Sequence, residues 1–332
     1  GLTFESAYGM LCMKLAFAFQ DYQFLLDDDA ISDDDKGIFK RILGRTASMD
    51  ETKSCFLLLT RMLEIHFKKS AVVILDEYDV PIAKASSNGY YSQMLDVMRA
   101  MMSTTLKDNT SLDFAVITGC LKIAKESIFT GTNNFVSDTI LSPRLSESFG
   151  FTQADVDQML KDAGLESQSA EIKAWYDGYH FGDADIYCPW DVINFAKKLV
   201  FDTSARPGTF WINSSGNDMV KRFVDKADQT TRDEIEKLVA GGFVEKQLRL
   251  DLTYDEIDNT IDNLWSVLFT TGYLTTVGEV RLPDSESYAY KLVIPNKEVR
   301  EVFVLQIQEW FKAVVAKDDD TMKLLSRANL DK

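Results

Sequence analysis

The sequence predicts an α/β fold in which a parallel sheet with helices is followed by a mostly helical region. Two mainly apolar runs, 71–75 and 114–119, predict strands that are buried on both faces, as in a parallel sheet. A helical pattern precedes each run, and the order helix, strand, helix, strand is typical of a doubly wound sheet with right-handed crossovers. From about Gly150 this rhythm ends, which separates the α/β part from the rest of the chain.

Composition and charge limit the classes of protein that remain. Hydrophobic residues make up 45% of the 332 residues and charged residues 27%, which are ordinary globular values. These values exclude a disordered tail, a collagen and a small disulfide scaffold, and the length predicts about two domains. The 36 basic and 52 acidic residues give a net charge of −16, which repels phosphate backbones. We therefore expect no unspecific binding of nucleic acid, although a local basic patch stays open.

Cysteine usage and hydropathy indicate the compartment. The cysteines form no C-x-x-C pair, which argues against a zinc cluster and favours reduced thiols in a cytoplasmic protein. No apolar stretch reaches the roughly 18 residues of a membrane span, and the first residues do not resemble a signal peptide, so we expect no membrane partner. Because the chain does not begin with Met, we interpret it as a fragment or a processed chain.

Helical patterns fill the first 70 residues. Apolar periodicity predicts a helix from Phe4 to Phe24. Ser32, followed by three aspartates, is typical of a helix start, where carboxylates meet the positive end of the helix dipole. A cation site at these aspartates is the less favoured alternative. Ser48 and Glu51 form a capping-box pattern that predicts a long helix to about Lys69. Its buried face would contain Phe56, Leu59, Met62, Leu63 and Phe67.

The part after the sheet predicts shorter elements. A helix over 152–160, an aromatic and glycine-rich hairpin over 175–187 and a helix that begins at Pro189 follow one another. The hairpin could instead be a stacking platform for a base, but its acidic surroundings favour a packed hairpin. Helices over 215–275 and strands over 272–294 then give the outline of a winged-helix unit.

The most informative local pattern is a pair of carboxylates after the first apolar run. Asp76 and Glu77 directly follow residues 71–75, which places them at the carboxyl edge of the sheet, where open α/β folds bind ligands. In P-loop NTPases an acidic pair at this point is the Walker B element: the Asp holds Mg²⁺, and the Glu orients or deprotonates the attacking water. Asp79 either adds charge to this site or closes the turn before Pro81.

A phosphate-binding loop would be the counterpart of this element. The pattern G-x-x-x-x-G-K-[ST] does not occur in the sequence. The segment most similar to this pattern is 119–126. It has Ala124 where a glycine must approach the phosphates, and Glu126 where Ser or Thr would bind Mg²⁺. We therefore reject it as a phosphate-binding loop. G-x-G-x-x-G and G-x-S-x-G are also missing, and the two histidines are next to no nucleophile motif. A carboxylate pair for glycoside hydrolysis stays open, because acids are plentiful.

Ordered sequence blocks point to a known family. They cover most of residues 1–305 and lie at 74–81, 117–119, 124–129, 133–134, 149–152, 175–179, 181–182, 187–190, 211–217, 264–265, 271–275 and 294–296. As a set they resemble the AAA-ATPase-like family of bacteria and archaea, in which this module often precedes a PD-(D/E)XK nuclease-like domain.

The resemblance implies a partial P-loop NTPase-like parallel sheet with helices, followed by a mostly helical region with a winged-helix-like unit. The implied domains are a partial AAA-like core at 1–150, a helical lid with the aromatic hairpin at 151–215, and a winged-helix-like region with a C-terminal helix at 216–332. The resemblance also implies roles for individual site residues. Asp76 would bind Mg²⁺ with Asp79 as a further ligand candidate, and Glu77 would be the catalytic carboxylate. Thr118 would sense the γ-phosphate, and Lys122 stands where the family usually has Arg, keeping the charge without the bidentate fork.

The implied function is that of an ATP-binding regulatory protein. The intact protein would bind and hydrolyse ATP with Mg²⁺ and thereby control an attached nuclease-like or partner domain. In the family the Walker A loop lies upstream of the point that matches Leu2, and the nuclease-like domain lies downstream of this chain. We therefore expect this chain alone to be inactive and to bind neither Mg²⁺ nor ATP. The alternative is a non-catalytic module on a decayed NTPase fold that interacts with a protein partner, a second copy or, less favoured by the charge, nucleic acid.

Overall fold

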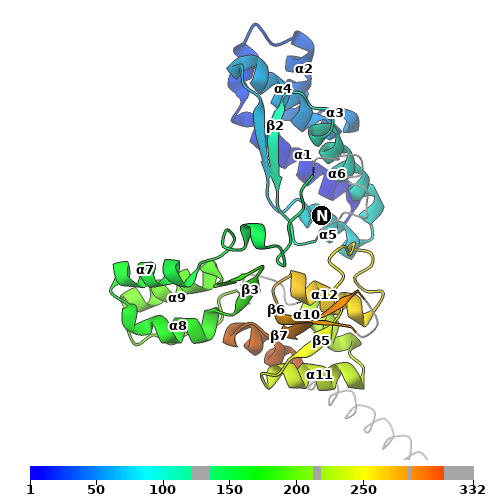
Figure 1. Cartoon of the computed structure of the whole chain (residues 1–332). Coiled ribbons are helices and arrows are strands. Elements are labelled where there is room, and N and C mark those ends of the chain that lie inside the picture. The colour runs from blue at the N-terminus through cyan, green and yellow to red at the C-terminus, as the bar shows by residue number, and fades with distance from the viewer. Residues whose placement is uncertain (122–134, 212–217, 283–285, 310–332) are drawn as a thin grey trace, which may run out of the picture. The chain divides into compact units, whose positions relative to one another are not determined.

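Figure 1 shows the computed structural model, which describes residues 1–121, 135–211, 218–282 and 286–309. The chain divides into two compact units, which comprise Gly1–Val136 with Leu250–Ile257 and Ser137–Arg249 with Asp258–Lys332. A small parallel sheet and many helices confirm the predicted α/β class. The division into three domains that the sequence suggested stays a prediction.

The first unit alternates helices with two strands. Its elements are α1 (Phe4–Gln20), the 3₁₀ helix η1 (Gln23–Asp27), α2 (Asp33–Leu43), α3 (Met49–Lys53), α4 (Cys55–Phe67), β1 (Ala71–Leu75), α5 (Val80–Asn88), α6 (Tyr91–Leu106) and β2 (Leu112–Ile117). The helices share one apolar core, whose buried members include Phe19, Phe39, Met62, Ile82 and Met101. The predicted order of helix, strand, helix and strand is therefore confirmed.

Strands β1 and β2 form a parallel sheet that the described residues cover on one face only. The register pairs Val72 with Phe114 and Ile74 with Val116. These side chains are respectively 46%, 53%, 74% and 45% exposed, whereas Leu75 packs against the helical core. The prediction of strands buried on both faces is wrong for the described residues. Apolar composition identified the strands, but it could not reveal what covers them.

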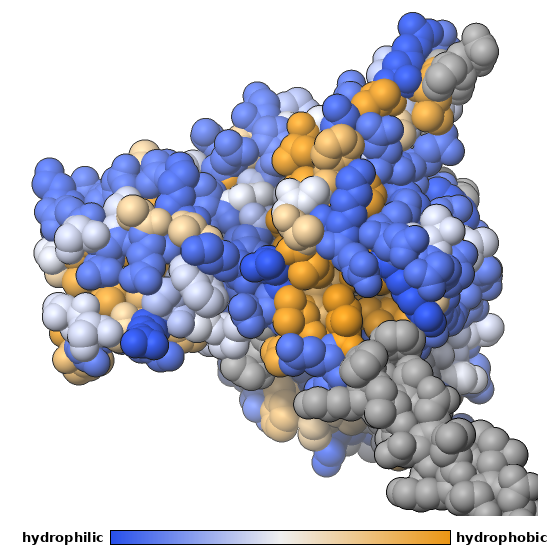
Figure 2. All heavy atoms as spheres, turned by 90° about the horizontal axis from the view of Figure 1, so that it is seen from below, coloured by the Kyte–Doolittle hydropathy of each residue, from blue (hydrophilic) through white to orange (hydrophobic). Residues whose placement is uncertain are grey.

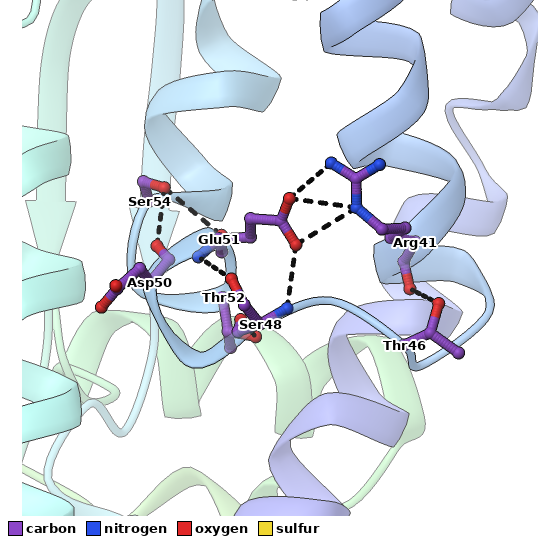
Figure 3. A network of polar contacts seen from close by, with 7 residues as sticks. All are labelled: Arg41, Thr46, Ser48, Asp50, Glu51, Thr52 and Ser54. Carbon is purple, nitrogen blue, oxygen red and sulfur yellow. Dashed lines mark hydrogen bonds and ion pairs between the residues drawn. The ribbon is translucent and has the colours of Figure 1, made fainter.

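The start of α3 confirms the predicted capping box (Figure 3). Ser48 Oγ accepts the Glu51 N–H at 3.2 Å, and Glu51 Oε2 accepts the Ser48 N–H at 2.8 Å. Arg41 of α2 donates from Nε to the same carboxylate at 3.0 Å, and this contact lowers the pKa of Glu51 to about 2. The predicted long helix is interrupted at Ser54, whose hydroxyl donates to carbonyl oxygens of the preceding turn. It ends at Phe67, which is 56% exposed rather than buried.

The aspartates after Ser32 belong to a helix start. Ser32 Oγ accepts the Asp35 N–H at 3.2 Å, and the Asp35 carboxylate pairs with Arg61. Among the residues that the structure describes, no group of three or more His, Cys, Asp or Glu side chains is placed to hold a metal. The predicted helix start at Ser32 is confirmed.

The second unit contains a group of helices with a hairpin and a separate antiparallel sheet. Its elements are the 3₁₀ helix η2 (Pro143–Leu145), α7 (Gln153–Ala163), the 3₁₀ helix η3 (Glu166–Gln168), α8 (Ser169–Tyr176), β3 (Tyr179–Phe181), β4 (Ala184–Ile186), α9 (Pro189–Phe201), α10 (Asp218–Lys226), α11 (Gln229–Val239), β5 (Val244–Lys246), α12 (Ile261–Thr270), β6 (Thr275–Arg281) and β7 (Tyr288–Val293). Helices α7, α8 and α9 lie together in Figure 1 and share a core of buried apolar side chains. Pro189 begins α9 as predicted.

The predicted aromatic hairpin consists of β3 and β4. Gly182 in its turn has φ +56°, a conformation that glycine adopts without strain. Tyr176, at the end of α8, is fully buried, and burial raises the pKa of the Tyr179 hydroxyl well above its usual range. These features support the packed hairpin over a base-stacking platform.

Helices and a three-stranded antiparallel sheet follow in the second unit. The strand order is β5-β7-β6, and α12 buries Trp265 completely against Phe223 of α10, with ring centroids 4.6 Å apart. Helices followed by an antiparallel ribbon is the element order that the sequence predicts here. The winged-helix assignment itself stays a prediction.

Figure 2 shows one face of the molecule, on which hydrophilic residues cover most of the surface. The hydrophilic cover is what 27% charged residues predict. Within the described part of the chain, no helix combines the length and the hydropathy that a transmembrane helix needs.

Candidate active site

The parallel register brings the ends of the two strands together. Leu75 and Ile117 are register partners, and Thr118 N–H donates to Leu75 O at 2.9 Å. Asp76 and Glu77 therefore follow β1, and Thr118 follows β2, at the same edge of the sheet. This is the carboxyl edge, where open parallel sheets bind their ligands.

Thr118 connects the two acidic residues. Its hydroxyl donates to Asp76 Oδ1, and its Oγ1 accepts the Glu77 N–H at 3.4 Å. The Asp76 and Glu77 side chains are exposed to solvent. In the described residues Asp76 Oδ2 has no hydrogen-bond partner, so this oxygen remains available to a ligand. Three of the residues singled out by sequence thus lie side by side.

Glu77 has a left-handed backbone with φ 53°. This conformation costs an L-residue about 1 kcal/mol or more, because its Cβ approaches a carbonyl oxygen. The strand before Glu77 and its hydrogen bond to Thr118 hold it in place. Strained residues of this kind cluster at active sites, so the conformation favours a functional role for Glu77.

Asp79 holds the loop that follows β2 through hydrogen bonds. The residue is 1% exposed, and its Oδ2 accepts hydrogen bonds from Cys120 N–H at 3.0 Å, Leu121 N–H at 2.9 Å and Tyr254 O–H at 2.8 Å. These contacts favour the turn-closing role of Asp79 over that of a metal ligand. Tyr254 belongs to the segment 250–257, and no sequence pattern marked it. Burial and the Asp79 carboxylate raise the pKa of the Tyr254 hydroxyl, which keeps it a donor.

Gly119 permits a close approach of the chain to Tyr78. A Cβ at Gly119 would lie 2.5 Å from the Tyr78 ring and 2.8 Å from Asp79 Oδ1. The Tyr78 hydroxyl in turn donates to Leu121 O at 2.8 Å. The glycine that could have started a phosphate loop therefore serves local packing. Lys122, the predicted sensor cation, lies outside the described residues.

The oxygen atoms at this edge suit a hard cation with few protein ligands. Asp76 offers a carboxylate and Thr118 a hydroxyl. Mg²⁺ typically takes one or two carboxylates and completes its octahedral shell with water and nucleotide phosphates. The donor set therefore fits a nucleotide-bound Mg²⁺ rather than a closed protein site. The nearby Cys120 thiol is no better ligand, because desolvation and the carboxylates of Asp79 and Glu77 raise its pKa.

Comparison with known proteins assigns the segment that contains this edge. Residues 19–129 match the family model described as a predicted AAA-ATPase. This segment is therefore similar to the AAA-ATPase-like family. It includes Asp76, Glu77, Thr118 and Lys122, and the resemblance inferred from the sequence blocks is confirmed over these residues.

One curated relative extends the similarity beyond the AAA-ATPase-like segment. It is described as an uncharacterized protein in the vnfD 5′ region of Azotobacter chroococcum mcd 1, and it is 26% identical over 264 residues. The match covers 79% of this chain but 48% of the relative, so this chain spans about half the length of that protein. No solved structure matches the chain.

A second cluster of titratable groups lies in the second unit and was not singled out by sequence. Asp191 of α9 and Glu298, in the helical residues 297–309, are 3% and 1% exposed. Glu298 Oε1 accepts the N–H groups of Phe210 at 2.6 Å and Trp211 at 2.7 Å. Burial and the neighbouring Asp191 raise the pKa of Glu298 to about 7, and burial raises the pKa of Asp191. Two carboxyl groups in one buried site therefore carry fewer than two negative charges near neutral pH.

Proposed function

We propose that the first unit supplies the metal-binding and hydrolytic side of an AAA-like ATPase centre in a cytoplasmic P-loop NTPase. The observation that carries the proposal is the meeting of Asp76, Glu77 and Thr118 at the carboxyl edge of adjacent parallel strands. The match of residues 19–129 to the predicted AAA-ATPase family supports it independently of the geometry.

Each residue has a separate role in this proposal. Asp76 is the Walker B aspartate, which would hold Mg²⁺ directly or through water on the nucleotide phosphates. Glu77 orients or deprotonates the water that attacks the γ-phosphate, and its exposed carboxylate is free to do so. Thr118 senses the γ-phosphate through the hydroxyl that here donates to Asp76. Lys122 adds positive charge near the phosphates.

The proposal needs a loop that binds the phosphates. Because G-x-x-x-x-G-K-[ST] does not occur in these 332 residues, the proposal assigns that loop to a part of the protein outside them. Residues 1–332 alone are then expected to be inactive, since backbone N–H groups and a lysine supply most of the affinity for phosphates. The second unit, with its winged-helix-like part, would transmit the nucleotide state to a nuclease-like or other partner domain.

The test uses the whole protein and a matched control at the opposite end of the neighbouring strand β2. We expect Asp76→Asn to abolish Mg²⁺-dependent hydrolysis of ATP, and Glu77→Gln to lower it by at least about 100-fold while ATP stays bound. Asp113→Asn, an exposed aspartate at the opposite end of β2, should leave the rate unchanged.

Three results would contradict the proposal. They are unchanged turnover in both site variants, an equal loss in the Asp113 control, and a whole protein that contains no G-K-[ST] loop. The last result would favour the non-catalytic interaction module, whose nucleotide-independent binding could be measured directly.

A further inference from the structure

Helix α9 has an apolar inner face and an unusual outer face. Val192, Phe195 and Leu199 are buried in the core that α9 shares with α7 and α8. The outer face carries Trp190 and Phe201, which are 55% and 92% exposed. Packing within the protein does not account for the exposure of these two large aromatic side chains. Exposed aromatic side chains of this kind are typical of binding surfaces.

An open cleft of about 490 Å³ follows this outer face. Trp190, Lys197, Lys198 and Phe201 line it from α9, and Phe210 lines it from the loop that follows the helix. Trp190 and Phe201 are eleven residues apart, which corresponds to about 16 Å along a helix. The cleft is long enough for three turns of a bound helix or about five extended residues.

The loop side of this cleft is held in place by buried groups. The Tyr176 hydroxyl, on a fully buried ring, donates to Gly208 O at 3.0 Å and accepts the Gly208 N–H at 3.1 Å. Glu298 Oε1 accepts hydrogen bonds from the N–H groups of Phe210 and Trp211 in the same loop. Because these hydrogen bonds already fix the loop, it loses little conformational entropy when a ligand binds.

The charge of the cleft is opposite to that of the chain. None of its lining residues is acidic, although the whole chain carries a net charge of −16. Lys197 and Lys198 form no ion pair with the described residues, and Lys198 Nζ lies 4.5 Å from the centre of the Phe210 ring. The nearby Asp202 carboxylate accepts hydrogen bonds from the Ser204 N–H and hydroxyl at 2.9 and 2.6 Å. The two lysines are therefore available to an anionic ligand.

We propose that this cleft binds a short acidic peptide segment of a partner protein. The segment would place an apolar side chain between Trp190 and Phe201, and its carboxylates would lie beside Lys197 and Lys198. Exposed aromatic anchors flanked by lysines that have no ion-pair partner among the described residues are complementary to a ligand of this composition. A nucleic acid strand fits less well, because two lysines cannot follow a phosphate backbone and the net charge of −16 repels a polyanion.

The experiment selects peptides without assuming a sequence. A phage-displayed library of random dodecapeptides is panned on the whole chain, and a fluorescent copy of an enriched peptide is titrated by anisotropy. We expect enriched peptides to combine Asp or Glu with Leu, Phe or Trp, and to bind more weakly as salt rises. Trp190→Ala should weaken binding about 30-fold, and the double change Lys197→Glu with Lys198→Glu about 10-fold or more.

Matched variants separate the cleft from the general surface. Phe149→Ala removes an aromatic side chain of similar exposure, 59%, and Lys161→Glu reverses an exposed lysine on α7; neither lines the cleft. Both should bind the peptide like the wild type. All variants are first checked for an unchanged circular dichroism spectrum, so that weaker binding is not loss of fold.

Several outcomes would overturn the proposal. Enriched peptides without acidic residues, or peptides whose affinity the lysine reversal does not change, would refute the charge argument. Binding of a fluorescein-labelled oligo(dT) of about 15 nucleotides, lost in the same variants, would assign the cleft to nucleic acid instead. Self-association in sedimentation velocity that Trp190→Ala abolishes would assign it to a second copy of the chain.

Discussion

Glu298→Gln tests the buried carboxyl pair with a small change of shape. Glutamine keeps an acceptor oxygen for the N–H groups of Phe210 and Trp211 but carries no charge at any pH. Its amide can also donate to the Asp191 carboxylate, which no ionised glutamate can do. A change in the pH dependence of stability then reports the titration of the buried pair of Glu298 and Asp191.

The size of the effect follows from the raised pKa. Burial and the Asp191 carboxylate raise the pKa of Glu298 from 4.5 to about 7, so between these values the folded state keeps a proton that the unfolded state has lost. This preference stabilises the fold fully below the ordinary pKa, and the contribution is lost as the pH rises through 7. Between pH 5.5 and 8 the linkage amounts to about 2 kcal/mol. Tyr176, Tyr179 and Cys188, the other titratable groups around the pair, stay neutral in this range because burial raises the pKa of each.

The assay is urea unfolding followed by tryptophan fluorescence, at intervals from pH 5.5 to 8. The lowest pH of the series, 5.5, lies above the sequence pI of about 4.6. Near the pI the net charge approaches zero, which promotes precipitation. The free energy of unfolding of Glu298→Gln, relative to wild type, should rise by about 2 kcal/mol across this range. Glu301→Gln, an exposed change on the same helix, should show no such trend. A parallel pH dependence of the wild type and Glu298→Gln would refute the assignment of a raised pKa to Glu298.

Three further changes test the first unit by urea unfolding. Glu77→Gly should stabilise the first unit by about 0.5–1 kcal/mol, because glycine adopts φ 53° without strain. Glu77→Ala keeps the Cβ and should not stabilise it. Equal effects of the two changes would argue against backbone strain at Glu77. Tyr254→Phe should destabilise it by about 1.5–3 kcal/mol, since the buried Asp79 carboxylate loses a donor; a neutral result would mean that this hydrogen bond does not hold the segment 250–257. Ile82→Ala should lower the free energy of unfolding by about 2–5 kcal/mol, because Ile82 is 0% exposed. Ile74→Ala should lower it by less than about 1 kcal/mol, because Ile74 is 74% exposed. Equal losses would show that something covers the outer face of the sheet.

Much of the first unit follows from local patterns. The capping box at Ser48, the helix start at Ser32 and both strands were predicted because they depend on neighbouring residues in the chain. The pair Asp76 and Glu77 was found for the same reason, since a strand and its last residues are adjacent in sequence. The three-residue arrangement with Thr118 needed one further fact, that consecutive parallel strands end at the same edge.

Other features depend on contacts that no local pattern encodes. Exposure of Ile74 is one, because an apolar run has the same composition whether one face of the sheet is covered or two. The interruption of the long helix at Ser54 is another, since a single serine is common inside helices. The left-handed backbone of Glu77 could not be read from a residue type that rarely adopts it.

The sequence by itself determined the α/β class, the strand ends that carry the acidic pair, and the similarity of residues 19–129 to the AAA-ATPase-like family. Only the tertiary structure decided that Asp79 is held by Tyr254 across 175 positions of chain, that Glu298 and Asp191 meet in a buried site, and that aromatic and basic side chains line one cleft. The physical reason is the same in each case. Periodicity and capping act within a few residues, whereas burial, pKa and cleft formation depend on groups that folding brings together from distant parts of the sequence.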